Sequence, residues 1–512
     1  MEEKYIVALE IGSSKIKGAI GIVDPQGTLS VKAVEEDKLY DGVRYGCIRN
    51  VVETAGAIRN VIGRLEMREP GRNVTGVYVS VGGRSLMAQG IEIERRLPQE
   101  MEITNELIAD MTGDALNYQL HERTIVDVTP KEFRVDNSPT NRAVGMFGSH
   151  VSARLNLISC RTQLVRNLNH VLDERLHLPV HDMFVRQIAE ADFVLYPEEK
   201  RQGCMLVDCG AETTTVSIYK NGVLLYMSTI PMGSRNITRD ITAMNYLEER
   251  AEELKIDGGN ALSSTEPTPM PSNGLIDYGQ INNYVAARAG EIIANINEQI
   301  KYAGLTPDRL PAGIILTGRG SKLNGFDRRL ENLTTLKVRY GGPVNRVRIL
   351  DGRINASDHV DVISILAAAA KDREVKECLS RPEPVVIAPE PIYNSIDEVR
   401  QQPSPQKPAY QQNAYQQNAY QQNAYQQSGY QQNSYQQSQQ PQQSQQSQQP
   451  QPQPAAPQRP EYQNPRPAEP EKPEPAPAPE KKRGFSLWGT VRERLVNLMT
   501  EPVEDDDIDN DN

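Results

Sequence analysis

Hydrophobic and polar positions divide this chain into two unlike parts. Up to about Arg381, short runs rich in valine and isoleucine alternate with stretches in which apolar residues recur every three or four positions. The short runs predict β-strands and the periodic stretches predict α-helices. From there to Phe485 apolar residues almost vanish, which is typical of a disordered segment. We therefore expect one folded α/β body followed by a long tail.

The same strand-turn-strand pattern occurs twice in the body. The stretch "YIVALEIGSSKIKGAIGIV" predicts a hairpin with Gly12, Ser13 and Ser14 at its tip. Half a chain later, "CMLVDCGAETTTVSIYKNGVLLYMSTIPMG" again predicts a strand, a tight turn and a strand. The repetition indicates two halves built on the same plan.

Two further stretches predict the rest of the body. Residues 85–161 look like a small inserted α+β unit, and a long helix is expected over 281–304 with Gly304 as its C-terminal stop. The apolar stripe of the insert's helix comprises Leu107, Ile108, Met111, Ala115 and Leu116. The apolar face of the long helix comprises Val285, Ala289, Ile292, Ile293, Ile296 and Ile300.

Charge, cysteines and histidines exclude several classes of function. The 512 residues carry a formal net charge of -11, which argues against a nucleic-acid partner. The five cysteines show no CxxC pair, so we expect reduced thiols rather than a disulfide framework or a zinc site. His177 and His181 are separated by Pro179, which argues against a helical metal site. Without a recognisable signal peptide or membrane-spanning run, we expect a soluble, cytoplasmic body.

The two predicted turns carry residues suited to holding a polyphosphate. The first contributes Glu10, Gly12, Ser13, Ser14 and Lys15, and the second contributes Asp208, Gly210, Thr213 and Thr214. Turn amides and hydroxyls donate to phosphate oxygens, and glycine permits close approach of the backbone. Carboxylates such as Glu10 and Asp208 hold the waters of a magnesium ion. Either turn alone is common in structural roles, but the pair indicates a clamp that holds a polyphosphate from two sides.

These motifs are similar to those of the actin/Hsp70/sugar-kinase superfamily and, within it, of the FtsA family of bacterial cell-division proteins. "VALEIGSSKIKGAIG" resembles the first phosphate loop, "LVDCGAETTTVSIY" the second, and "IILTGRGSKLNGF" the adenosine loop. The resemblance covers residues 5–380, and the insert at 85–161 lies where this family carries its relocated small subdomain. It implies an α/β, actin-like ATPase fold of two duplicated halves.

The resemblance also implies a division into domains. The first core comprises residues 1–84, completed by 162–205 and about 358–380, and the second comprises 206–241, completed by about 283–357. The remaining parts are a second-half small subdomain at 242–282, a disordered Pro/Gln/Asn-rich linker at 381–480, an amphipathic membrane-targeting helix at 481–500 and an acidic end at 501–512.

The resemblance adds nucleotide-binding positions and shows where the chain departs from the family. It adds Gly233, Glu252, Lys255, Gly318, Arg319 and Gly320, of which Glu252 and Lys255 would contact the ribose hydroxyls. Ala211 and Glu212 stand where glycines are usual, and Glu212 would repel phosphates unless the loop turns its side chain away. Arg319 also replaces a glycine, where it would either stack on the purine or partly block the pocket. We therefore expect ATP and Mg as cofactors but slow hydrolysis at most.

A helical wheel of residues 485–499 places apolar side chains on roughly half of the circumference. This face comprises Phe485, Leu487, Trp488, Val491, Leu495, Val496, Leu498 and Met499, and it follows Lys481, Lys482 and Arg483. Such a helix is suited to lie in the interface of an anionic membrane, with the basic residues among the lipid headgroups. The alternative is a helix that docks onto the body or onto a partner protein by the same face.

Together these features predict an actin-like, ATP-binding cell-division protein. By resemblance it would polymerise, bind the C-terminal peptide of the tubulin-like GTPase FtsZ through residues 242–282, and contact other division proteins. It would be a peripheral membrane protein on the cytoplasmic side of the cell inner membrane, at the division site. The alternatives are another actin-like assembly protein, of the pilus-assembly or partition type, and a small-molecule kinase of the same fold.

Overall fold

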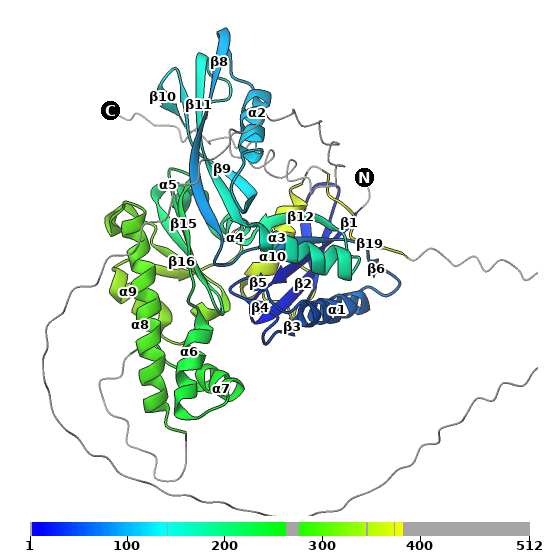
Figure 1. Cartoon of the computed structure of the whole chain (residues 1–512), viewed down its shortest axis with the longest axis vertical. Coiled ribbons are helices and arrows are strands. Elements are labelled where there is room, and N and C mark those ends of the chain that lie inside the picture. The colour runs from blue at the N-terminus through cyan, green and yellow to red at the C-terminus, as the bar shows by residue number, and fades with distance from the viewer. Residues whose placement is uncertain (1–2, 141, 263–275, 345–346, 373, 382–512) are drawn as a thin grey trace, which may run out of the picture. The chain divides into compact units, whose positions relative to one another are not determined.

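The structure is a computed structural model that describes residues 3–140, 142–262, 276–344, 347–372 and 374–381 (Figure 1). The linker beyond Arg381, the predicted terminal helix and the acidic end lie outside the described residues. The same holds for most of the Pro/Ser-rich stretch within the predicted subdomain 242–282, at residues 263–275.

The first half is built on a mixed sheet with the strand order β12-β7-β1-β2-β3-β18. Its strands are β1 (Lys4–Ile11), β2 (Lys15–Val23), β3 (Leu29–Lys38), β7 (Val77–Val81), β12 (Val180–Val185) and β18 (Arg348–Ile349). β1 and β2 form the predicted antiparallel hairpin, closed by the pair Ile11 and Ile16. β7 lies parallel to β1, and β12 lies parallel to β7.

The second half repeats this arrangement in the order β15-β14-β13-β16-β17. Its strands are β13 (Cys204–Cys209), β14 (Thr214–Lys220), β15 (Val223–Ile230), β16 (Ile314–Thr317) and β17 (Val338–Tyr340). β13 pairs antiparallel with β14 and parallel with β16, as β1 pairs with β2 and β7. The central strands β13 and β16 are buried throughout, which fits their mainly apolar sequences, in which Asp208 and Thr317 are the polar residues. The predicted duplication is therefore present in the topology.

Helices cover both faces of the first sheet. They are α1 (Val51–Arg68), α4 (Arg186–Val194) and α10 (Val360–Ala370). Two shorter helices pack elsewhere: α3 (Thr162–Asn169) lies against β5 and the insert, and α5 (Pro197–Gln202) lies against β14. On β2, the position of Gly18 faces Val61 of α1, whereas that of Gly21 faces Leu366 of α10. Because successive strand residues point to opposite faces, α1 and α10 pack on opposite sides of the sheet.

The second half carries helices α6 (Ser234–Ile241), α7 (Glu248–Gly258), α8 (Tyr278–Tyr302) and α9 (Phe326–Thr334). In Figure 1 these are the green helices, with α6 and α9 on either side of the long α8. All six apolar residues of the predicted face of α8 are buried. Gly304 follows the last turn with φ of 72°, and its amide donates to the carbonyl of Lys301. Gly304 therefore ends the helix as predicted.

The buried face of α8 gives a prediction for stability. Ile296→Val removes one methylene from a fully buried side chain, so we expect the free energy of unfolding to fall by about 1 kcal/mol. Ile256→Val on α7 is the matched control, because Ile256 is 72% exposed and its truncation should cost less than about 0.5 kcal/mol. Urea unfolding of both variants provides the measurement, and equal losses would contradict the packing of α8.

The insert is a separate two-layer unit, as predicted. It comprises β8 (Met87–Glu102), α2 (Asn105–Leu116), β9 (Arg123–Val135), β10 (Ser138–Thr140) and β11 (Phe147–Arg161). The four strands form an antiparallel sheet in the order β10-β9-β11-β8. Ile108, Met111 and Ala115 of α2 are buried in a core with Phe133 and Leu155 of the sheet, and Leu107 and Leu116 pack against its edge.

The described residues also form four further short strands. They are β4 (Val43–Arg44), β5 (Cys47–Ile48), β6 (Asn73–Val74) and β19 (Leu379–Ser380). β18 pairs with β3 in the first sheet, although the resemblance assigns residues up to about 357 to the second half. β13 begins at Cys204, slightly before the predicted start of the second core at 206. A strand as short as β18 has no hydrophobic alternation from which its partner could be predicted.

Among the described helices, none combines the length and the apolar composition needed to cross a membrane.

Candidate functional site

Two matching turns line one cavity between the duplicated halves. In the first turn the amide of Gly12 donates to the carbonyl of Lys15, and in the second the amide of Gly210 donates to the carbonyl of Thr213. Each turn follows the central strand of its sheet, β1 or β13. We call the space between them the inner cavity; it is lined from the first half by residues 10–15 and from the second by Asp208, residues 210–213 and Gly318.

A second, larger cavity of about 980 Å³ adjoins the first, and we call it the outer cavity. Its wall includes Glu252 and Lys255 of α7 and Gly320 after β16. It shares Ser14, Lys15, Ala211, Gly318, Arg319 and Asp361 with the inner cavity. Adjoining cavities of this size are suited to a small-molecule ligand such as a nucleotide, with phosphates at one end and a nucleoside at the other.

Thirteen of the predicted nucleotide-binding residues line one or both cavities: Glu10, Gly12, Ser13, Ser14, Lys15, Asp208, Gly210, Thr213, Glu252, Lys255, Gly318, Arg319 and Gly320. Thr214 and Gly233 do not. Thr214 is fully buried and its hydroxyl donates to the carbonyl of Met232, 2.9 Å away. Gly233 packs against the backbone of Ala211. These two residues therefore support the second turn from outside the cavities.

The carboxylates of Glu10 and Asp208 are held by an arginine that the sequence reasoning did not single out. Arg186, the first residue of α4, places Nη1 2.6 Å from Oε1 of Glu10, and its Nη2 pairs with Oδ2 of Asp208. Nε2 of Gln187 also donates to Oδ2 of Asp208 at 3.0 Å. Beside them, the buried Lys17 of β2 pairs with Asp361 of α10.

The ionisation of this cluster follows from its burial and its charges. Burial raises the pKa of Glu10, against the opposing charge of Arg186. Burial and the neighbouring Asp208 raise the pKa of Glu190 well above its ordinary value. Burial also acts to raise the pKa of Asp361, but the ammonium of Lys17 lowers it overall. Burial would lower the pKa of Arg186, yet Asp208 and Glu10 raise it, so the guanidinium stays ionised.

The predicted water-mediated Mg²⁺ site at Glu10 and Asp208 does not fit these residues as they are arranged. Arg186 occupies one oxygen of each carboxylate, so the waters of a magnesium ion would have to share both carboxylates with a guanidinium. In the part of the chain that the structure describes, no group of three or more His, Cys, Asp or Glu side chains is placed to bind a metal.

The side chain of Glu212 is directed to the first half, although the residue also belongs to the wall of the inner cavity. Its fully buried carboxylate accepts from the amide of Tyr45 at 2.7 Å and lies 2.7 Å from Nε of Arg44, both in the first half. Arg239 and Arg235 of α6 approach Oε1 at 3.1 and 3.5 Å. Three arginines therefore offset the charge of this carboxylate, which would otherwise repel phosphates.

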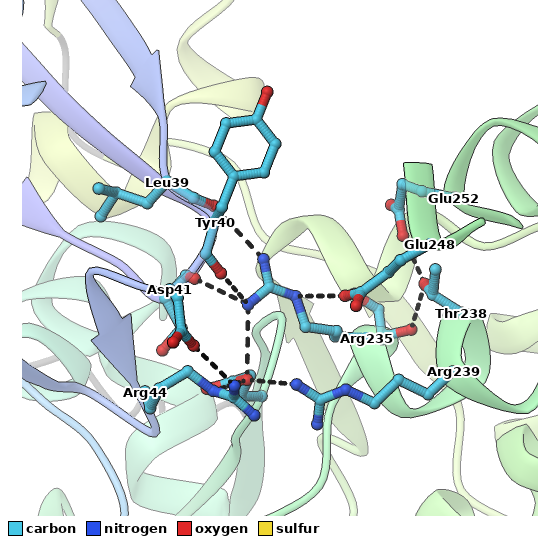
Figure 2. Close-up of polar contacts among 12 residues, drawn as sticks. Leu39, Tyr40, Asp41, Arg44, Arg235, Thr238, Arg239, Glu248 and Glu252 are labelled. Carbon is cyan, nitrogen blue, oxygen red and sulfur yellow. Dashed lines mark hydrogen bonds and ion pairs between the residues drawn. The ribbon is translucent and has the colours of Figure 1, made fainter. Parts of the chain in front are cut away.

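Arg235 extends the contact between the halves, as Figure 2 shows. Its guanidinium lies between Glu248 of the second half and the backbone carbonyls of Leu39 and Tyr40 of the first. The same group donates to the carbonyl of Ser13 in the first turn at 3.2 Å. Below it, Arg44 and Arg239 approach one another from opposite sides. We call Glu212, Arg44, Arg235 and Arg239 the arginine cluster.

Arg319 lines both cavities and pairs with a carboxylate of the first half. Its Nη2 lies 3.0 Å from Oε2 of Glu36 on β3, and Lys15 pairs with the other oxygen of the same carboxylate. Although burial acts to raise the pKa of Glu36, these two cations lower it overall. In the outer cavity, Nζ of Lys255 donates to Oε2 of Glu252 at 2.7 Å, which places this predicted ribose pair together on α7.

Some of these residues carried a signal in the sequence. Lys17 interrupts the apolar strand "KIKGAIGIV", and a buried lysine calls for an acidic partner. Asp361 opens the apolar helix "VDVISILAAAA" in the same way. Arg186 follows a buried strand directly, but nothing near it in the sequence points to Glu10 or Asp208 as its partners.

The duplicated sheets with facing turns at their central strands define an actin-like ATPase fold. A similar arrangement occurs in the "PilM-PilN type IV pilus biogenesis complex", with a TM-score of 0.52 at 17% identity over 71% of this chain and 98% of the other. A family model described as "Cell division protein FtsA" matches residues 205–364, and one described as "SHS2 domain inserted in FTSA" matches residues 83–159. In both its body and its insert, the chain is therefore similar to the FtsA family of cell division proteins.

Curated relatives agree over most of the body. The chain is 29% identical over 365 residues to cell division protein FtsA of Porphyromonas gingivalis, which covers 69% of this chain and 74% of the relative. It is 28% identical over 386 residues to FtsA of Neisseria meningitidis, covering 72% of this chain and 91% of that protein. The family and the actin-like fold predicted from the sequence are confirmed, and the match at 83–159 confirms the insert.

Proposed function

We propose that this division protein binds ATP and links filaments of FtsZ to the cytoplasmic face of the inner membrane. The observation that carries the proposal is the pair of matching turns around the inner cavity, in a chain similar to the FtsA family. The phosphates would lie between residues 12–15 and 210–213, and the nucleoside would extend into the outer cavity towards Glu252 and Lys255. Binding at the junction of the halves would couple the nucleotide to self-assembly.

The protein acts in this proposal as a nucleotide-dependent scaffold rather than as a fast enzyme. The carboxylates nearest the phosphates are already engaged by cations, which makes them poor general bases. Steady-state turnover above about 1 per second with ATP and a small-molecule acceptor would favour the kinase alternative instead.

Two surfaces would join the FtsZ filament to the membrane. Residues 242–282, of which the structure describes α7 and its surroundings, would bind the C-terminal peptide of FtsZ. Residues 481–500 would attach the chain to anionic lipid. The proposal for the second surface rests on the sequence pattern, with Trp488 in the apolar face and Lys481–Arg483 before it.

Sedimentation with vesicles that contain anionic lipid tests the membrane link. We expect Trp488→Glu to bind at least about tenfold more weakly than the natural chain, because it places a charge in the apolar face. Thr490→Glu is the matched control, since it adds the same charge to the polar face and should bind within about threefold of the natural chain.

The same vesicle sedimentation, repeated with and without ATP, tests whether nucleotide promotes assembly. ATP should increase the sedimented fraction of the natural chain if nucleotide promotes assembly on the vesicles. Undiminished binding of Trp488→Glu would overturn the membrane link, and an unchanged fraction with ATP would overturn the nucleotide dependence.

A further inference from the structure

A protein cation, the guanidinium of Arg186, lines the inner cavity at the place where the fold family implies a divalent metal. We propose that the guanidinium of Arg186 substitutes for that metal, so that this site binds ATP with little or no dependence on Mg²⁺. The proposal rests on the proposed nucleotide site and assigns Arg186 as a positioning residue within it.

Arg186 contacts carboxylates from three elements. Nη1 lies 2.6 Å from Oε1 of Glu10 on β1, Nη2 pairs with Oδ2 of Asp208 on β13, and Nε lies 3.4 Å from Oε1 of Glu190 on α4. The side chain of Arg186 is 15% exposed, and those of Glu10, Asp208 and Glu190 are 5%, 4% and 1% exposed. One planar cation therefore joins the central strands of both halves.

This arrangement places the guanidinium on one oxygen of each predicted metal-holding carboxylate, where it competes with the waters of a metal ion. A guanidinium stays charged and presents its N–H groups in a fixed fork that matches carboxylate oxygens. Arg186 is also the first residue of α4, between the buried residues Val185 and Gln187, so its backbone position is fixed by the core. Displacing its side chain would leave a largely buried cation without its partners, which is unfavourable.

The charge of Arg186 also favours binding of the phosphates. Arg186 lines the inner cavity, as do Lys15 of the first turn and Lys17 of β2. Unneutralised carboxylates at Glu10 and Asp208 would repel a polyphosphate across this short distance. The guanidinium offsets that repulsion, which is the electrostatic task a divalent cation would otherwise perform.

Titration of the full chain with a fluorescent ATP analogue, with excess Mg²⁺ or with EDTA, tests the proposal. We expect dissociation constants that agree within about threefold in the two conditions. Binding that weakens more than about tenfold in EDTA would overturn the role of Arg186 and leave the nucleotide site intact. Absence of binding in both conditions would overturn the nucleotide site itself, and this inference with it.

Arg186→Gln provides the second arm. Its loss of charge should expose Glu10 and Asp208 to metal, so analogue binding should fall at least about tenfold in EDTA and recover with Mg²⁺. Without nucleotide, Mg²⁺ should raise the melting temperature of this variant and leave the natural chain unchanged. Arg201→Gln, at a surface pair with Glu198, should behave as the natural chain.

Failure of Mg²⁺ to affect either the binding or the melting of Arg186→Gln would overturn the substitution of arginine for metal. If that variant does not fold in any condition, the comparison of Mg²⁺ with EDTA on the natural chain decides the question alone.

Discussion

Gly318→Ala is expected to weaken ATP binding by more than about 100-fold. Gly318 follows β16, lines both cavities and has φ of 77°, where a side chain is strained. A Cβ atom there would lie 2.3 Å from the carbonyl oxygen of Cys209 and 2.7 Å from Oδ1 of Asp208. Because the first of these neighbours is backbone, the loop after β16 must move away from the second turn, which opens the site. A fluorescent ATP analogue provides the measurement.

Gly304→Ala is the matched control for this prediction. Gly304 has a similar φ of 72°, but a Cβ atom there meets nothing within 4 Å, and the residue lies outside both cavities. It should lower the free energy of unfolding by about 1 kcal/mol and leave the affinity for ATP unchanged. If Gly318→Ala retains affinity within about threefold of the natural chain, the loop after β16 is not part of the nucleotide site.

Glu212→Ala should lower the free energy of unfolding by about 3 kcal/mol. The change removes a fully buried carboxylate and leaves Arg44, Arg235 and Arg239 close together without their shared anion. It also leaves the amide of Tyr45 without its acceptor. Because Arg44 and Tyr45 belong to the first half, the lost stability comes from the contact between the halves. Chemical unfolding of the natural and variant chains provides the measurement.

Glu248→Ala is the control for the arginine cluster. Glu248 also pairs with Arg235, at 3.4 Å, but its side chain is 49% exposed, so its removal should cost less than about 1 kcal/mol. A double-mutant cycle between Glu212→Ala and Arg235→Ala should show a coupling above about 0.5 kcal/mol. Additive losses would show that the cluster does not act as a unit.

The fold was accessible from the sequence because its main elements are long and regular. The face of α8 from Val285 to Ile300 repeats at helical spacing, and β1 and β2 are joined by a short glycine turn. Similar turn motifs at Gly12 and Gly210 revealed the duplication. β18 could not be predicted, because a strand of two residues is defined by the edge it joins rather than by its own pattern.

The site was accessible only in part. Residues near the two turns follow from local motifs, and most of them line the cavities. The pairing of Arg186 with Glu10 and Asp208 is a property of three elements that meet only in the fold. The direction of Glu212 depends on Arg44 and Tyr45, which lie far away in the chain. Charge neutralisation of this kind leaves no periodic signal in a sequence.

The five cysteines are unpaired thiols, and their burial has a practical consequence. Cys160, Cys204, Cys209 and Cys378 are at most 3% exposed, and burial raises the pKa of Cys160 to about 11 and of Cys204 and Cys378 to about 12. Cys47 alone among the five is partly accessible, and it directly follows Gly46, which lines the inner cavity. Because thiolates react and buried thiols do not, a maleimide dye should label the native chain at one position. The unmodified protein thus supplies its own attachment point for a fluorophore that reports on the cleft.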